Sequence, residues 1–254
     1  MTDPGSLALA EQAARAAGRL LAVGPRRDAA VVGETARDVK LQADRDAEDR
    51  IVDVLASGSG IPVVAEERAA DAAPHSSEGL RWIVDPLDGT MNYLQGIPFC
   101  CVSIALWNGD EPVSGVVYDF DRDEMFSGIV GTGAWLNGRP VRVRPVPPNR
   151  AVLFTGFPAG TDFAPASLTR FVTQVSTFRK IRMLGSAALW LAYVAAGRGD
   201  AYFERDIRIW DVAAGLALVR GAGGTFLSAP SPVDHALNVY AHNGACPWPD
   251  AAFA

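Results

Sequence analysis

The chain has few of the residues that mark several large classes of protein. Its 254 residues include three cysteines, Cys100, Cys101 and Cys246, and an odd number with two adjacent does not make a disulfide framework. No phosphate-cradling Cys-x5-Arg loop follows them, which argues against a catalytic thiol. The apolar run around Cys100 and Cys101 indicates a small hydrophobic residue in a buried strand. Cysteines that do not form a disulfide framework fit a reducing compartment, and we therefore expect a cytoplasmic protein.

Histidine is equally scarce. The three histidines, His75, His235 and His242, show neither metal-ligand spacing nor an Arg-His-Gly motif. This disfavours both a histidine metal site and a phosphohistidine mechanism. The sequence also lacks a G-x4-G-K-[ST] loop, so it does not read as an ATPase or kinase module.

Long apolar runs and blocks of basic residues are missing as well. No apolar run approaches the roughly 18 residues of a membrane span, and no basic segment precedes an apolar core near the N-terminus. The net charge is −6 without a Lys/Arg block, which argues against general nucleic-acid binding. With 49% hydrophobic and 20% charged residues, the chain can bury a large core. We therefore expect a globular enzyme that acts without membrane or nucleic-acid partners.

The predicted elements mix helices and strands. In the first part of the chain the patterns predict helices over 7–23 and 44–56 and strands over 63–65, 82–84, 101–107, 113–119, 124–130 and 141–143, with a polar loop over 73–79. Asn108-Gly109-Asp110 and Asn137–Pro140 are turns between strands. In the second part they predict strands over 151–155, 178–183, 201–204, 225–227 and 239–242, and helices over 168–177, 185–196 and 210–220.

The Pro-rich stretch 145–148 is the best boundary between these parts. We expect an N-terminal half, 1–144, and a C-terminal half, 149–254, in one compact unit of layered α and β elements.

The most informative segment runs from Trp82 to Tyr93. An apolar strand ends in two carboxylates three residues apart, Asp85 and Asp88, and Gly89 and Thr90 follow. Mg²⁺ prefers carboxylate, carbonyl and water oxygens, so the two aspartates and the Leu87 carbonyl suit a cation. The amides of Gly89 and Thr90 could hold a phosphate oxygen, as exposed amide nests do. An Asx-rich turn without a ligand is the competing interpretation of this segment taken alone.

Two further segments end in carboxylates. Val63-Val64-Ala65 leads to Glu66, which could be a third metal ligand or the solvated end of a strand. Asp211 follows a large apolar residue, Trp210, and precedes a small-residue helix, where it could equally be an N-cap.

Together these segments resemble the inositol monophosphatase family, the lithium-sensitive, magnesium-dependent sugar phosphatases. Asp85-Pro86-Leu87-Asp88-Gly89-Thr90 is identical to the family's D-P-[IL]-D-G-T signature, and Asn92-Tyr93 match its following N-[FY]. Trp210–Gly215 match its W-D-x-A-[AG]-[AG] signature, and Val64–Glu67 resemble its strand ending in a Glu pair. The matches occur in the family's order and span nearly the whole chain. The resemblance implies an α-β-α-β-α sandwich with the site between its two halves.

The resemblance also implies roles for individual residues. Metal ligands would be Glu66, Asp85, the Leu87 carbonyl, Asp88 and Asp211. The catalytic residues would be Glu66 and Thr90, with Asp44 behind the attacking water. Substrate contacts would come from Asp88, Gly89, Thr90, Gly185, Ser186, Ala187, Glu204 and Asp211.

The sequence departs from the family pattern around Asp44. Asp38–Asp44 carries Lys40-Leu41 where the family has Val-Thr, which puts the role of Asp44 in doubt. After Glu204, Arg205 and Arg208 could contact a second anionic group of the substrate, although surface charge is the favoured interpretation.

The activity implied is hydrolysis of a small phosphate ester with two or three Mg²⁺ ions, by metal-activated water and without a phosphoenzyme. Inositol monophosphate is the first choice of substrate. Fructose 1,6-bisphosphate, 3′-phosphoadenosine 5′-phosphate and histidinol phosphate are the alternatives on the same fold. A non-catalytic, metal-binding scaffold is a further alternative, because fold alone does not fix function. A homodimer and lithium sensitivity follow from the resemblance alone.

Overall fold

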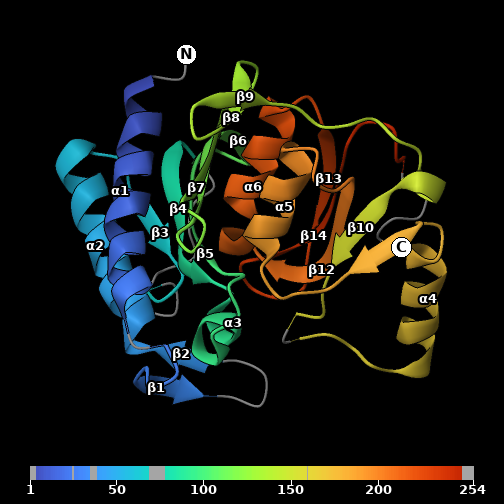
Figure 1. Cartoon of the computed structure of the whole chain (residues 1–254), viewed down its shortest axis with the longest axis horizontal. Coiled ribbons are helices and arrows are strands. Elements are labelled where there is room, and N and C mark those ends of the chain that lie inside the picture. The colour runs from blue at the N-terminus through green and yellow to red at the C-terminus, as the bar shows by residue number, and fades with distance from the viewer. Residues whose placement is uncertain (1–3, 25, 35–38, 69–77, 159, 248–254) are drawn as a thin grey trace.

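Two mixed β-sheets alternate with three layers of helices (Figure 1). The computed structural model describes residues 4–24, 26–34, 39–68, 78–158 and 160–247. The helices α1 (Pro4–Val23) and α2 (Gln42–Gly58) cover the outer face of the larger sheet, and α4 (Pro165–Val175) covers the outer face of the smaller one. Between the sheets lie α5 (Ala187–Ala195) and α6 (Ile209–Gly221). The predicted α-β-α-β-α sandwich is confirmed.

The larger sheet has seven strands in the order β3-β4-β5-β6-β7-β8-β9. The pair β3/β4 is parallel and all other pairs are antiparallel. Its strands are β3 (Val63–Ala65), β4 (Leu80–Asp88), β5 (Cys101–Asn108), β6 (Glu111–Asp119), β7 (Glu124–Ile129), β8 (Gly133–Leu136) and β9 (Arg139–Val141). Asn137 and Gly138 both adopt positive φ, 48° and 75°, as a two-residue hairpin turn of type I′ requires.

The smaller sheet has five strands in the order β11-β10-β12-β14-β13. The strand β10 is parallel to both neighbours, whereas β14 is antiparallel to β12 and to β13. Its strands are β10 (Val152–Thr155), β11 (Lys180–Arg182), β12 (Ala201–Arg208), β13 (Thr225–Pro230) and β14 (Ala236–His242). The register of β12 shifts between Glu204 and Ile207, and Asp206 has a φ of 55° there. This bulge re-aims the end of β12 next to α6.

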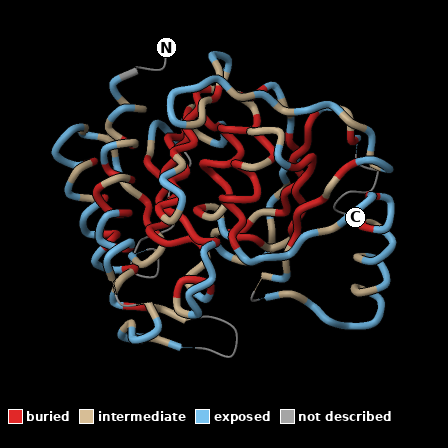
Figure 2. Tube along the Cα trace, in the orientation of Figure 1, coloured by how far each residue is buried: buried red, intermediate tan, exposed pale blue. Residues whose placement is uncertain are grey.

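The middle helical layer is apolar on every side because each of its helices touches both sheets. The buried residues of α6 run from Val212 to Val219 without interruption, and the central strands and helices form the buried core (Figure 2). Gly115 of β6 permits this packing: a Cβ there would lie 2.3 Å from the backbone oxygen of Ala214. The outer helix α1 instead buries one stripe, formed by Ala10, Ala13, Ala14, Ala17 and Leu21.

Several predicted boundaries are wrong. The strand β4 does not end at Val84 but continues through Asp88, with a register shift between Asp85 and Asp88. Unpredicted elements are β1 (Val31–Glu34), β2 (Val39–Leu41), β8, the short helix α3 (Thr90–Gln95) and the 3-10 turn η2 (Pro148–Arg150). The strand predicted over 178–183 is limited to β11, and the one predicted over 141–143 lies earlier, as β9.

Most of the polar loop predicted over 73–79 lies outside the described residues. Within the described part of the chain, no helix combines the length and the apolar character that a bilayer span requires.

Candidate active site

Three carboxylates from separate elements meet between the layers. Glu66 follows β3, Asp85 lies on β4, and Asp211 lies in the first turn of α6. Each offers a ligand oxygen, and these oxygens all lie within 4.8 Å of one another. The N-cap of α6 is Arg208, so Asp211 does not cap the helix; it carries its negative charge near the positive end of the helix dipole.

The environment of these carboxylates opposes their negative charge. Burial raises the pKa of Asp85 well above its ordinary value, and the charges of Glu66 and Asp211 raise this pKa further. Burial also raises the pKa of Asp211 well above its ordinary value, with Asp88 and Glu66 adding to the effect. Carboxylates this close together, of which Asp85 is buried, fit a divalent cation, which replaces mutual repulsion by attraction.

Asp88 lies in the same cavity but outside this group of three. Its Oδ2 accepts hydrogen bonds from the Ser186 hydroxyl and from the Ala188 N–H, both at 2.7 Å. Burial raises the pKa of Asp88 to about 6, and the bonds from Ser186 and Ala188 oppose this rise. Asp88 therefore joins the larger sheet to the N-terminus of α5.

The turn after Asp88 is held by its own backbone and side chains. Gly89 has a φ of 93°, and a Cβ there would lie 2.9 Å from the Phe99 carbonyl oxygen. The Thr90 hydroxyl donates to the Leu87 carbonyl at 3.0 Å. The Leu87 N–H donates to Asp85 Oδ1 at 2.9 Å. Glycine is thus required at position 89 by conformation and by space.

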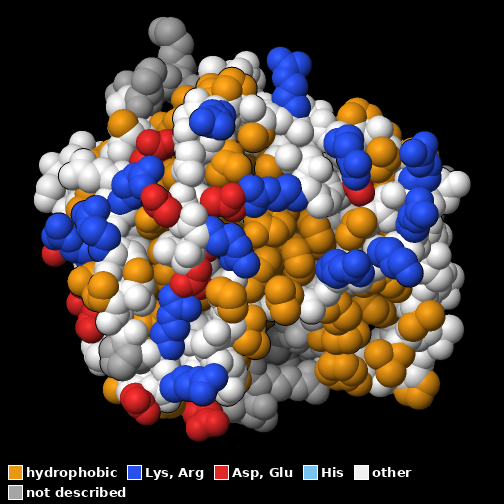
Figure 3. Space-filling model, viewed as in Figure 1, with side chains coloured by type: hydrophobic (Ala, Val, Ile, Leu, Met, Phe, Trp, Pro, Cys, Tyr) orange, Lys and Arg blue, Asp and Glu red, His pale blue; other side chains and the backbone are white. Residues whose placement is uncertain are grey.

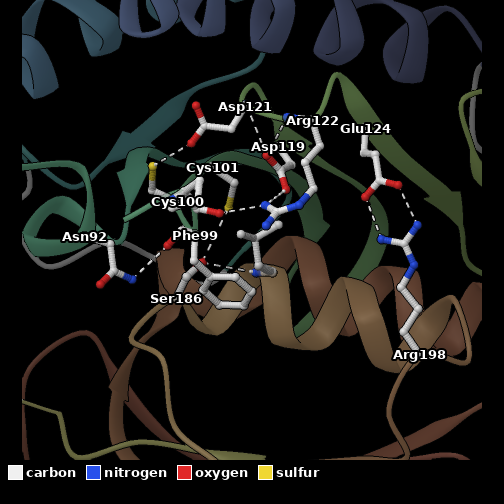
Figure 4. Close-up of polar contacts among 12 residues, drawn as sticks. Asn92, Phe99, Cys100, Cys101, Asp119, Asp121, Arg122, Glu124, Ser186 and Arg198 are labelled. Carbon is white, nitrogen blue, oxygen red and sulfur yellow. Dashed lines mark hydrogen bonds and ion pairs between the residues drawn. The ribbon is translucent and has the colours of Figure 1, made fainter. Parts of the chain in front are cut away.

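Further polar contacts fix α5 against the larger sheet (Figure 4). The Asn92 amide donates to the carbonyls of Phe99 at 2.8 Å and Leu184 at 2.5 Å. At the other end of α5, Arg198 binds Glu124 through two nitrogens, each at 2.5 Å. Such bidentate pairs set orientation as well as distance, so both ends of the helix are anchored.

A cavity of about 390 Å³ opens over the acidic group. It is lined by most of the predicted site residues, namely Glu66, Asp85, Leu87, Asp88, Gly89, Thr90, Gly185, Ser186, Ala187, Glu204, Arg208 and Asp211. The sequence did not single out Met91, Gly156, Phe157, Pro158, Asp206 and Ile207, which line it too.

Among these, Gly156 carried a signal in the sequence, because it directly follows a predicted strand. A Cβ at this position would lie 2.6 Å from Glu204 Oε1, so glycine leaves room for that carboxylate. Burial raises the pKa of Glu204 to about 8, and the charge of Asp88 raises it further.

Two predicted site residues do not line this cavity. Asp44 is buried in the first turn of α2, where its Oδ2 accepts the Leu41 N–H at 2.6 Å. Arg205 lines a neighbouring cavity. Arg208 does reach the main cavity, and its guanidinium donates to the Asp234 carbonyl.

The segment that follows β3 is fixed by contacts with residues that the sequence did not assign to the site. The buried Glu48 of α2 accepts the Glu67 N–H at 2.8 Å, next to Glu66. Lys40, one of the departures from the family pattern, forms an ion pair with Glu67 at 2.9 Å. These contacts position the backbone that carries Glu66.

Comparison with known proteins agrees with the motifs. A model of the inositol monophosphatase family matches residues 6–244. The Nus factor SuhB of Xylella fastidiosa is 49% identical over 152 residues, covering 57% of this chain and only 54% of that relative. The inositol-1-monophosphatase of Mesorhizobium japonicum is 43% identical over 190 residues, covering 74% of this chain and 71% of that protein. The crystal structure of extragenic suppressor protein suhB from Bartonella henselae has a TM-score of 0.81 at 36% identity, covering 94% of this chain and 93% of that one.

The layered fold, the acidic cavity and these matches define a phosphatase, a hydrolase of phosphoric monoesters. Within that class, the chain belongs to the inositol monophosphatase family.

Proposed function

We propose that the protein is a Mg²⁺-dependent phosphatase of small polyol or sugar phosphates, with inositol monophosphate as the first choice of substrate. The observation that carries this proposal is the meeting of Glu66, Asp85 and Asp211 beside the Gly89-Thr90 turn in one cavity. Cation ligands and phosphate-binding amides share that space. The similarity to the inositol-1-monophosphatase of Mesorhizobium japonicum supports the choice of inositol phosphate.

Two or three Mg²⁺ ions would be held by Glu66, Asp85, the Leu87 carbonyl, Asp88 and Asp211. When bound, Mg²⁺ neutralises phosphate charge and lowers the pKa of a water. Asp88 would contribute Oδ1, because Oδ2 is engaged by Ser186 and Ala188.

The remaining steps belong to the side chains and backbone of the cavity. The amides of Gly89 and Thr90 would bind the phosphate oxygens. The Thr90 hydroxyl donates a hydrogen bond to the Leu87 carbonyl, so the lone pairs of its oxygen can accept a hydrogen bond from the attacking water. Glu66 would accept the proton of that water, and Asp44, which is buried in the first turn of α2, would lie behind it. Most of the rate gain would come from positioning and charge stabilisation.

The alcohol part of the substrate would meet Glu204 and the start of α5 at Gly185, Ser186 and Ala187. These residues line the same cavity as Glu66; Glu204 lies on a strand of the smaller sheet, whereas Glu66 follows a strand of the larger one. Fructose 1,6-bisphosphate, 3′-phosphoadenosine 5′-phosphate and histidinol phosphate are the competing substrates. Homodimerisation, lithium sensitivity and a cytoplasmic location stay predictions.

The proposal is tested by phosphate release from each of these four esters, with Mg²⁺ and with EDTA. Mg²⁺-dependent release, strongest on inositol 1-phosphate, is the expected result. Asp211→Asn should abolish it, whereas Asp53→Asn, an exposed change on α2, should not. Release only from another ester would keep the reaction and replace the substrate. A folded, Mg²⁺-binding protein that releases phosphate from none of the four would contradict the proposal and favour the scaffold alternative.

A further inference from the structure

One buried group beside Asp88, the thiol of Cys101, has no part in the proposed mechanism. Cys101 is the first residue of β5 and pairs with Asp88 of β4 beyond the register shift. Its Sγ donates to Asp88 Oδ2 at 3.8 Å and lies at the same distance from the Ser186 hydroxyl oxygen. A thiol is a weak donor, so it adds to a contact whose stronger part is made by Ser186.

The hydroxyl of Ser186 is committed to contacts inside the protein. Ser186 is buried and is the N-cap of α5, where its oxygen accepts the Leu189 N–H at 3.4 Å. Its single proton is donated to Asp88 Oδ2 at 2.7 Å. The hydroxyl therefore has no proton left for a substrate, and contact with the alcohol would fall to the backbone at the start of α5.

Three donors from two elements converge on one oxygen of Asp88. The Ser186 hydroxyl and the Ala188 N–H reach Oδ2 from the start of α5, and the Cys101 thiol reaches it from β5. Asp88, Ser186 and Cys101 are all buried, so water competes little for these bonds. Because Oδ2 is held, Oδ1 is the oxygen available to a cation in the cavity that Asp88 lines.

The preceding residue, Cys100, is as fully buried as Cys101 but contacts a different carboxylate. The Cys100 thiol lies 4.0 Å from Asp121 Oδ2, and Figure 4 shows it turned toward that side chain. The two cysteines therefore differ in the carboxylate that their thiols contact and not in burial.

We propose that Ser186 and Cys101 are positioning residues for Asp88, which hold its Oδ2 so that Oδ1 is left for the cation. For Ser186 this role differs from the substrate contact that the family resemblance implies. A ligand that is fixed before the cation arrives loses little freedom on binding, and loss of such outer contacts typically costs about 10- to 100-fold in metal affinity. The inference rests on the Mg²⁺ site of the proposed function and deepens it.

The first test is calorimetric titration of Mg²⁺ into the wild-type protein and two variants of Ser186. Ser186→Ala removes the hydroxyl and should weaken Mg²⁺ binding about tenfold. Ser186→Thr keeps the hydroxyl and the helix cap, so it should bind Mg²⁺ nearly as the wild type does. Loss of the cap alone would lower the melting temperature in EDTA without changing the Mg²⁺ affinity. Unchanged or tighter Mg²⁺ binding by Ser186→Ala, or equal weakening in both variants, would overturn the role of Ser186.

The two cysteines supply a matched pair for the second test. Cys101→Ala should weaken Mg²⁺ binding about twofold to threefold, because a weak hydrogen bond is lost, whereas Cys100→Ala should keep the wild-type affinity. Both positions are buried, so neither replacement alters the Asp and Glu side chains at the surface, several of which Figure 3 shows. A difference between the two variants therefore reports the buried site. Equal affinities would overturn the role of Cys101, and this comparison decides the proposal if Ser186→Ala does not fold.

Failure of this inference can be told apart from failure of the phosphatase proposal, because phosphate release is measured separately. A wild type that binds Mg²⁺ but releases no phosphate from any of the four esters contradicts the proposed function and leaves the calorimetric comparison decisive. Mg²⁺-dependent release with equal Mg²⁺ affinity in all variants keeps the phosphatase and overturns the positioning roles. A wild type that binds no Mg²⁺ overturns both.

Discussion

Replacing Asp88 by asparagine should stabilise the metal-free protein while removing its activity. Burial raises the pKa of Asp88 from 3.8 to about 6, so above pH 6 the fold holds a carboxylate that prefers to be neutral. This shift corresponds to about 3 kcal/mol of unfolding free energy lost at pH 8. The raised pKa already includes the opposing effect of the hydrogen bonds from Ser186 and Ala188, and an asparagine oxygen can still accept both bonds. The Asp88→Asn variant should therefore recover about 2–3 kcal/mol of unfolding free energy at that pH.

The direction of the pKa shift of Asp88 determines the pH range in which the variant and the wild type differ in stability. The folded-state pKa of Asp88 is raised, so its contribution to stability is fully present below the unfolded value near 4 and is lost as pH rises through 6. In EDTA, the variant and the wild type should melt together at pH 4. At pH 8 the variant should melt roughly 5–10 °C higher, given the size of the chain.

Magnesium should reverse this order. A cation that binds the folded state stabilises it by mass action, and we expect Mg²⁺ to raise the melting temperature of the wild type much more than that of Asp88→Asn. Differential scanning calorimetry of both proteins at both pH values, with Mg²⁺ and with EDTA, gives the melting temperatures that the comparison requires. A variant that is less stable than wild type in EDTA at pH 8, or an equal Mg²⁺ response in both proteins, would refute the reasoning. Asp53→Asn, on the exposed face of α2, is the control and should change neither quantity.

Three further predictions follow from single contacts. Glu66→Gln should lower Mg²⁺-dependent phosphate release by roughly a hundredfold or more, since a proton acceptor is lost; near-normal turnover would contradict its role. Gly115→Ala should destabilise the protein by about 1–3 kcal/mol or more in urea unfolding, because the new Cβ would lie 2.3 Å from the Ala214 oxygen. Gly60→Ala, where nothing lies within 4 Å, is its control. Burial raises the pKa of Glu204 to about 8, so in EDTA the wild type should lose stability as pH rises from about 4.5 through 8, and Glu204→Gln should flatten that profile in thermal melts.

The sequence predicted those helices and strands whose hydrophobic pattern is visible within the element itself. The outer helices α1 and α2 show apolar periodicity, whereas α5, α6 and the central strands are nearly continuous apolar runs. All of them appear close to their predicted positions, although several of their ends are shifted. The strands β1, β2 and β8 are three or four residues long, which is too short to show a period. The continuation of β4 through Pro86 depends on pairing with β5 across a register shift, which no local pattern encodes.

For the candidate site, the sequence could name residues but not distances. Glu66, Asp85 and Asp211 are recognisable because each follows an apolar run, yet only the packing of α6 against the sheet brings their oxygens together. The use of Asp88 Oδ2 by Ser186 and Ala188 depends on contacts across about 100 residues of chain, and no spacing rule predicts it. The lining role of Phe157 and Asp206 was missed for the same reason: Phe157 lies in the irregular segment after β10 and Asp206 in the bulge of β12, and neither belongs to a motif.

The acidic group and the neighbouring cavity that Arg205 lines are built largely from different elements of the fold. This has a consequence for how such proteins diversify. The acidic group uses the ends of β3 and β4 and the start of α6, which lie between the two sheets, and its Asp85 is buried. The neighbouring cavity that Arg205 lines draws on α4, which lies on the outer side of the smaller sheet and carries several exposed residues. Substitutions at the exposed positions of α4 therefore need not displace the acidic group. Such changes would offer a route by which one hydrolytic centre comes to accept different alcohols.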